Sequence, residues 1–128
     1  MRVLVFGTFD HLHPGHRFLL DAAEERGELF VVVACDEVVQ HIKGFLPTQN
    51  QEERMKVITE VYPAATVLCG DAQDYLVPVR EAKPDLVLLG YDQQFPPGIT
   101  EADLPCPIER TEPHKPDLYK SSILRKEG

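Results

Sequence analysis

Short apolar runs, each about the length of one strand, recur along the chain with helix-like segments between them. The clearest run is LFVVVA at residues 29–34, which is continuously apolar and rich in β-branched side chains. A strand that is apolar on both faces is typical of a parallel sheet covered by helices on both sides. Similar runs lie at residues 2–6, 65–69 and 85–90, with a weaker one at 106–110.

Helix signals occupy the intervening segments. Residues 14–26 begin with a proline, which suits the first turn of a helix, and Gly27 follows as a C-terminal stop. In TQNQEERMKVITEV, Thr48 and Gln51 have the spacing of a capping box. A further helix is expected to start at Pro78, and the serines of SSILRKEG are expected to cap a closing helix.

This alternation predicts right-handed β-α-β crossovers and one α/β domain over residues 1–128, with a Rossmann-like, doubly wound, five-stranded parallel sheet. In such sheets, ligands bind beyond the carboxyl ends of the strands, where the strand order reverses. The turn after the first strand, GTFDHLHPGH, is therefore the expected ligand site.

Composition limits the classes of partner. The formal net charge is −8, which disfavours binding to nucleic acid or to an anionic membrane. We find no apolar run long enough to span a bilayer and no signal peptide, so we expect a cytoplasmic protein. Cys35, Cys69 and Cys106 lack C-x-x-C spacing and are expected to be reduced thiols.

The GTFDHLHPGH turn combines two glycines with three histidines. Gly7 allows the backbone to turn tightly after the strand, and Gly15 lies where a side chain would block close approach to the helix N-terminus. The exposed amides at a helix N-terminus attract anions. His13 and His16 are three residues apart, so both rings can point to the same side.

Three interpretations fit these histidines. They could be surface caps of the helix. Alternatively, His11, His13 and His16 could bind Zn²⁺ or Fe²⁺ together with Asp10, because imidazole and carboxylate suit both ions. The third interpretation is a pair of donors to a phosphate. The Pro-Gly step between the histidines favours this last one, because it serves helix initiation and phosphate approach rather than metal coordination.

The turn resembles the G-x-F-D-x-x-H-x-G-H signature of the nucleotidylyltransferase superfamily, whose H-x-G-H is related to the HIGH motif of class I aminoacyl-tRNA synthetases. ACDEVVQHIKG is similar to the family's second strand and lysine loop, and QEERMKVI to its arginine-bearing helix. KPDLVLLGYDQ is similar to its fourth strand and base-side loop, and YKSSILRK to its closing helix. The chain is most similar to archaeal-type FAD synthases and, next, to glycerol-3-phosphate cytidylyltransferases.

The resemblance implies the nucleotidylyltransferase fold and attack by a phosphorylated acceptor on the α-phosphorus of a nucleoside triphosphate, with release of pyrophosphate. ATP and FMN are the expected substrates, which makes the product FAD. The alternative is a CTP-dependent enzyme acting on glycerol 3-phosphate or a similar phosphoalcohol. The resemblance also implies Mg²⁺ or another divalent cation on the triphosphate, small molecules as the only other partners, and a homodimer.

Carried over residue by residue, the resemblance gives expected site residues. The catalytic residues are His13, His16, Lys43 and Arg125. The nucleotide is expected to contact both histidines and Gly7, Thr8, Phe9, Gly90, Asp92, Tyr119, Ser121 and Ser122. The acceptor is expected to contact Asp10, Asp36, Lys43 and Arg54. No residue is assigned to a protein-bound metal.

Two features bear on the remaining choices. A domain that binds nucleotides without turnover is the non-enzyme alternative, and the intact H-x-G-H and SSILR sequences argue against it. Arg110-Thr111-Glu112 resembles the start of the RTEGISTT motif of cytidylyltransferases, but PHKPDLYK is inserted before the serines. The ending YKSSILRKE and the GYDQ loop are more similar to the adenylyl-transferring branch, so the sequence favours ATP.

Overall fold

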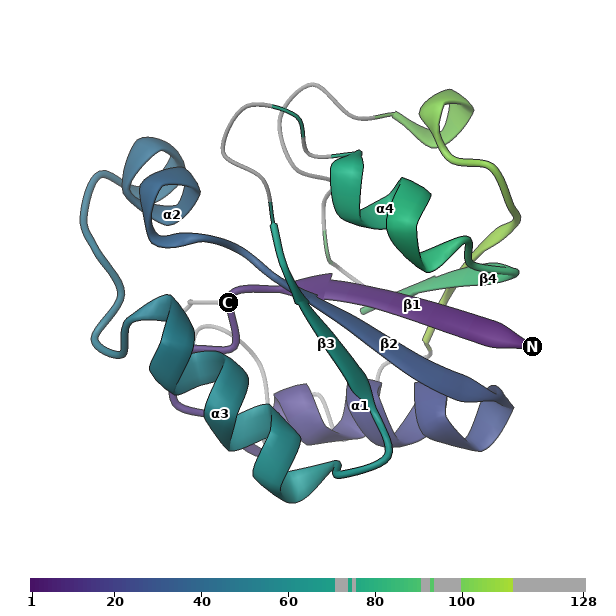
Figure 1. Ribbon diagram of the computed structural model, residues 1–128, viewed down its shortest axis with the longest axis horizontal. Helices are drawn as coiled ribbons and strands as arrows, with labels where there is room; N and C mark the ends of the chain where they lie inside the picture. The colour runs from purple at the N-terminus through teal and green to yellow at the C-terminus, as the bar shows by residue number, and fades with distance from the viewer. Residues whose placement is uncertain (71–73, 75, 91–92, 94–99, 112–128) are drawn as a thin grey trace.

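The computed structural model describes residues 1–70, 74, 76–90, 93 and 100–111, apart from the side chains of Ile42, Lys43 and Glu101 (Figure 1). The expected closing helix, with Tyr119, Ser121, Ser122 and Arg125, lies outside the described residues, and so does Asp92.

The centre of the fold is a five-stranded sheet whose neighbouring strands all pair in parallel, in the order β3-β2-β1-β4-β5. This arrangement confirms the expected doubly wound α/β sheet. The strands are β1 (Arg2–Gly7), β2 (Glu28–Val33), β3 (Thr66–Cys69), β4 (Leu86–Leu89) and β5 (Ile108–Arg110).

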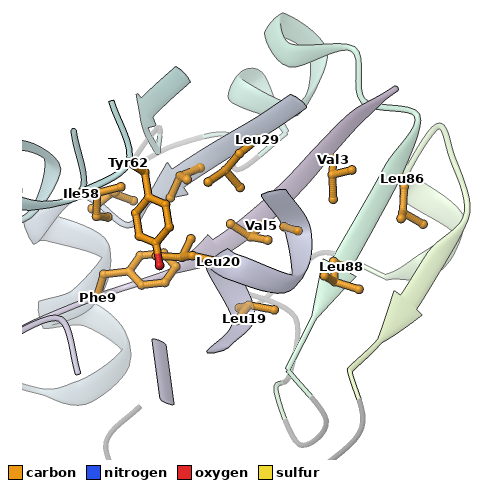
Figure 2. Close-up of a cluster of buried hydrophobic side chains, with 13 residues drawn as sticks. Val3, Val5, Phe9, Leu19, Leu20, Leu29, Ile58, Tyr62, Leu86 and Leu88 are labelled. Atoms are coloured by element: carbon orange, nitrogen blue, oxygen red, sulfur yellow. The ribbon is translucent and has the colours of Figure 1, made fainter. Parts of the chain in front are cut away.

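Helices cover both faces of the sheet (Figure 1). Alternate side chains of β1 serve the two faces: Val3 and Val5 belong to the cluster that includes side chains of α1 and α3, whereas Leu4 and Phe6 belong to the cluster on the side of α4. Figure 2 shows the first cluster, in which Phe9 lies among strand and helix side chains. The helices are α1 (Pro14–Arg26), α2 (Asp36–Lys43), α3 (Gln51–Val61) and α4 (Val77–Ala82), with a short 3₁₀ turn at Glu101–Asp103.

Two sequence expectations need correction at the helices. The segment expected to be a lysine loop is the helix α2, which buries Val38 and Val39. It is followed by Gly44 as its C-cap, in a left-handed conformation with φ 83°. The capping box of α3 is formed by Asn50 and Glu53 and not by Thr48 and Gln51. Asparagine is among the best N-cap residues, so α3 starts two residues later than the threonine would place it.

The strand order reverses between β1 and β4. The strand β1 pairs with β2 from Arg2 through Gly7, whereas its register with β4 covers Val3 and Leu4. The carboxyl ends of β1 and β4 therefore leave room for the loops that follow them, which is the usual ligand site of such a sheet. The H-x-G-H turn follows β1, and the GYDQ segment follows β4.

Candidate active site

His13 is the N-cap of α1 and is bonded to the helix through its side chain. Its Nδ1 atom accepts hydrogen bonds from the backbone N–H groups of Gly15, at 3.1 Å, and His16, at 3.3 Å. His16, three residues on, accepts the backbone N–H of His13 with its own Nδ1 at 3.3 Å. The two histidines thus form a reciprocal capping box, a role usually filled by other residue types.

This capping fixes what the rings can do for a ligand. A ring nitrogen that accepts a backbone N–H carries no hydrogen, so His13 and His16 each carry theirs on Nε2 and can donate from that atom. The rings are stacked, with centroids 3.6 Å apart and planes 16° apart. The expectation that both rings face the same side is confirmed, and the result is a pair of adjacent N–H donors at a helix N-terminus.

Gly15 lies close against the His13 ring. A Cβ atom at this position would lie 3.0 Å from Cε1 of His13 and 3.2 Å from its Nδ1. A side chain there would therefore require the capping ring to shift by a few tenths of an ångström. The Pro-Gly step between the histidines permits both the helix start and the ring stacking.

The turn before the histidines has an unusual backbone. Phe9 and His11 have positive φ angles of 55° and 53°, which costs on the order of 1–3 kcal/mol each for residues other than glycine. The Phe9 side chain is 2% exposed and meets the ring of His16 edge-on, at 5.2 Å between centroids. A Cβ at Gly7 would lie 2.7 Å from the Phe9 ring, so this glycine admits the aromatic side chain into the core.

Asp10 ties the same turn to the segment before α3. Its carboxylate accepts the backbone N–H groups of Thr48 at 2.9 Å and Gln49 at 3.0 Å. The backbone N–H of His11 donates to Oε1 of Gln49 at 3.0 Å. The sequence assigned Asp10 to the acceptor, whereas the structure shows both carboxylate oxygens bonded to the protein backbone.

These contacts shift the pKa of Asp10. Burial of the carboxyl opposes its charged form, but the hydrogen bonds from Gln49 and Thr48 and the charges of His11 and Arg54 outweigh burial, so the pKa lies below its ordinary value of 3.8. Because the folded pKa is lower than the unfolded one, the carboxylate stabilises the fold above the unfolded pKa. That stabilisation is lost as the pH falls through the folded pKa.

We expect Asp10→Asn to lower the melting temperature (Tm) at neutral pH and to make Tm depend less on pH in the acid range. The measurement is Tm as a function of pH from about 5 down to about 3. The wild-type Tm should fall more steeply than that of the variant, because only the wild type must protonate this carboxylate. If the Tm curves of the wild type and the variant run parallel over this pH range, the charge of Asp10 contributes nothing to the stability of the fold.

Arg54 does not reach toward a ligand in this structure. Its side chain is fully buried, at 0% exposure, and Nη2 donates to Oδ1 of Asp36 at 2.7 Å. Asp36 also accepts the backbone N–H of Gln51 at 3.3 Å, and its side chain keeps 31% exposure. The structure therefore replaces the expected acceptor-binding role of Arg54 by a role inside the protein. The Asp36 side chain remains partly exposed, so it can still contact an acceptor substrate.

The loop after β4 contains a residue that the sequence analysis did not select. Gln93 donates from Nε2 to the carbonyl of Phe6 at 2.9 Å and accepts the backbone N–H of Gly90 at 3.0 Å. It thereby joins the carboxyl ends of β1 and β4 at the reversal point. Arg110 donates to the carbonyls of Gly90 at 3.1 Å and Gln93 at 2.5 Å. An amide side chain four residues after the end of an apolar strand was the available sequence signal.

Lys43 is the last residue of α2, and only its backbone is described.

Among residues with a described placement, no group of three or more His, Cys, Asp or Glu side chains could hold a metal ion. Within the described ranges, no helix is both long and apolar enough to cross a lipid bilayer.

Comparison with known proteins gives concordant matches. The family model described as "Cytidylyltransferase-like" matches residues 4–111. The FAD synthase of Methanosarcina mazei is 41% identical over 104 residues, which is 80% of this chain and 68% of that protein. The FAD synthase of Methanospirillum hungatei is 34% identical over 134 residues, covering 98% of this chain and 85% of its own length.

A solved structure is similar over almost its whole length. The lipopolysaccharide core biosynthesis protein of Thermoplasma volcanium has a TM-score of 0.75 and 33% identity, and the match covers 88% of this chain and 96% of that one. The parallel sheet with the H-x-G-H turn at its reversal point, taken together with these matches, identifies a nucleotidyltransferase. The chain belongs to the cytidylyltransferase-like family, and its similarity to archaeal FAD synthases agrees with the resemblance seen in the sequence.

Proposed function

We propose that this protein transfers the adenylyl group of ATP to FMN, forming FAD and releasing pyrophosphate. The observation that carries the proposal is the pair of stacked histidines whose Nε2–H donors stand at the N-terminus of α1. Donors in that position suit the oxygens of a triphosphate. The names of the archaeal relatives support ATP and FMN as the substrates.

The proposed chemistry needs alignment and charge stabilisation more than it needs a base. The terminal phosphate of FMN is already anionic at neutral pH, since the second pKa of a phosphomonoester is about 6. One of its oxygens forms a bond to the α-phosphorus of ATP as the bond to pyrophosphate breaks. His13 and His16 would donate to oxygens that gain charge in the transition state.

Other groups complete the proposal. Lys43 and Arg125 would neutralise the triphosphate, Ser121 and Ser122 would donate hydrogen bonds to its β- and γ-phosphates, and the loop after β4 would meet the adenine. Nucleotidyltransferases generally use a divalent cation. An ion that arrives on the triphosphate keeps most of its waters and needs few protein ligands. We also propose a homodimer, by analogy with the family.

A flavin acceptor would account for an exposed apolar pair on the segment between α2 and α3. Phe45 and Leu46 are 61% and 56% exposed, on the segment between α2 and α3 that Asp10 holds through Thr48 and Gln49. Exposed apolar side chains that lie together mark places where a ligand or partner binds. The ring system of FMN offers a flat apolar surface, whereas glycerol 3-phosphate offers none.

We therefore expect the double substitution Phe45→Ala and Leu46→Ala to raise the KM for FMN while leaving the KM for ATP unchanged. The measurement is steady-state pyrophosphate release with each substrate varied in turn. Val61→Ala is the control, because this side chain is also exposed, at 39%, but lies at the far end of α3. An equal rise in both KM values would remove the pair from acceptor binding.

The substrate assignment is tested by screening ATP and CTP against FMN, glycerol 3-phosphate and phosphocholine for pyrophosphate release. We expect ATP with FMN to exceed every CTP pair by roughly tenfold or more in kcat/KM, because a site that hydrogen-bonds adenine leaves polar groups unpaired against cytosine. Faster release from CTP with glycerol 3-phosphate would reassign the substrates and leave the role of the histidines intact.

A further inference from the structure

Arg54 gathers backbone groups that are far apart in the sequence. Its Nη1 donates to the carbonyls of Thr8 and Ala34, both at 2.8 Å, and its Nε donates to the carbonyl of Gln49 at 3.0 Å. These carbonyls belong to the turn after β1, the turn after β2 and the segment before α3. The ion pair with Asp36 occupies Nη2. One fully buried guanidinium therefore fixes three connections at the carboxyl edge of the sheet.

The turn after β1 depends on such ties because its backbone is strained. Phe9 and His11 both have positive φ angles, and a backbone of this kind persists only where its surroundings hold it. Arg54 holds the turn at Thr8, and the hydrogen bond from the backbone N–H of His11 to Gln49 holds it at the other end. Both ties come from one short segment, residues 49–54.

We propose that Arg54 is a positioning residue for the transfer reaction: it locks the strained turn that leads into His13 and His16 together with the segment before α3. The inference rests on the proposed function for its catalytic consequence but not for its geometry. An arginine is needed because its planar fork reaches three carbonyls and a carboxylate at once. A lysine ammonium is a single point donor that cannot span them.

The test compares Arg54→Lys with Ile58→Ala. Ile58 is also 0% exposed and lies one turn further along α3, but it belongs to the apolar cluster and not to this network. Both variants should have a lower Tm. At a temperature below both transitions, we expect Arg54→Lys to lose roughly tenfold or more in kcat with little change in the KM for ATP, because misplaced donors act on the transition state. Ile58→Ala should retain its kcat.

Amide hydrogen exchange gives a second readout that needs no substrate. Exchange at the His11 amide should accelerate in Arg54→Lys and stay slow in Ile58→Ala. Gln49→Ala removes a partly exposed side chain that holds the other end of the turn, and this variant should fold. Its kcat therefore tests whether the turn positions the donors even if Arg54→Lys does not fold. It should accelerate exchange at His11 and lower kcat in the same direction.

The outcomes separate this inference from the proposed function. Equal kcat losses in Arg54→Lys and Ile58→Ala, or unchanged exchange at His11 in both network variants, would contradict the positioning role. A wild-type protein that fails to convert ATP and FMN would overturn the proposed function. The exchange comparison would still decide whether Arg54 locks the turn.

Discussion

His16→Ala is expected to lower kcat by roughly a hundredfold or more, since removing one preorganised transition-state donor costs about 2.7–4 kcal/mol. The Nδ1 atom of His16 is bonded to the backbone N–H of His13, which leaves Nε2–H as the donor that the substitution removes. The measurement is single-turnover FAD formation, with Tm recorded on the same preparation.

The fold should survive this change. The variant loses one reciprocal cap bond, the stacking on the His13 ring and the edge contact with Phe9, while the bond from the backbone N–H of Gly15 to His13 is kept. Glu24→Ala is the control, because this exposed residue lies on α1 and touches none of these groups. Near-wild-type turnover in His16→Ala would remove the imidazole from the chemistry.

His13→Asp should separate the two roles of the first histidine. Aspartate is among the preferred N-cap residues and its charge complements the helix dipole, so we expect Tm to stay close to that of the wild type. The carboxylate cannot donate to a phosphate and would repel it. We therefore expect kcat/KM for ATP to fall by roughly a thousandfold.

His13→Ala is the matched comparison. It loses the N-cap as well as the donor, so its stability should fall by about 0.5–2 kcal/mol, while its activity falls about as far as that of His16→Ala. If His13→Asp keeps most of the wild-type activity, His13 acts only as a helix cap. If its Tm falls as far as that of His13→Ala, the capping geometry is wrong.

The sequence predicted those elements whose signals are local. Pro14 at the first position and Gly27 after the end define α1 with the expected bounds, and the continuously apolar runs predict a sheet covered on both faces. That the rings of His13 and His16 point to the same side also follows from local spacing, because residues three apart at a helix start share a side, whereas their stacking is seen only in the structure.

The sequence did not predict features that depend on distant partners. Nothing near Arg54 in the sequence indicates that the carbonyls of Thr8 and Ala34 accept its hydrogen bonds. Polar residues that bridge loops are found only after the strand order is known.

The central claim is that this site transfers a nucleotidyl group from ATP to FMN, and following the α-phosphate tests it most directly. ATP labelled at the α-phosphorus is incubated with FMN and the wild-type protein or His16→Ala, and the products are separated. We predict that the wild type moves the label into FAD with one pyrophosphate released per FAD, and that the variant hardly does so. Label that remains in ATP or appears as AMP, while labelled CTP yields a product with glycerol 3-phosphate, would contradict the account.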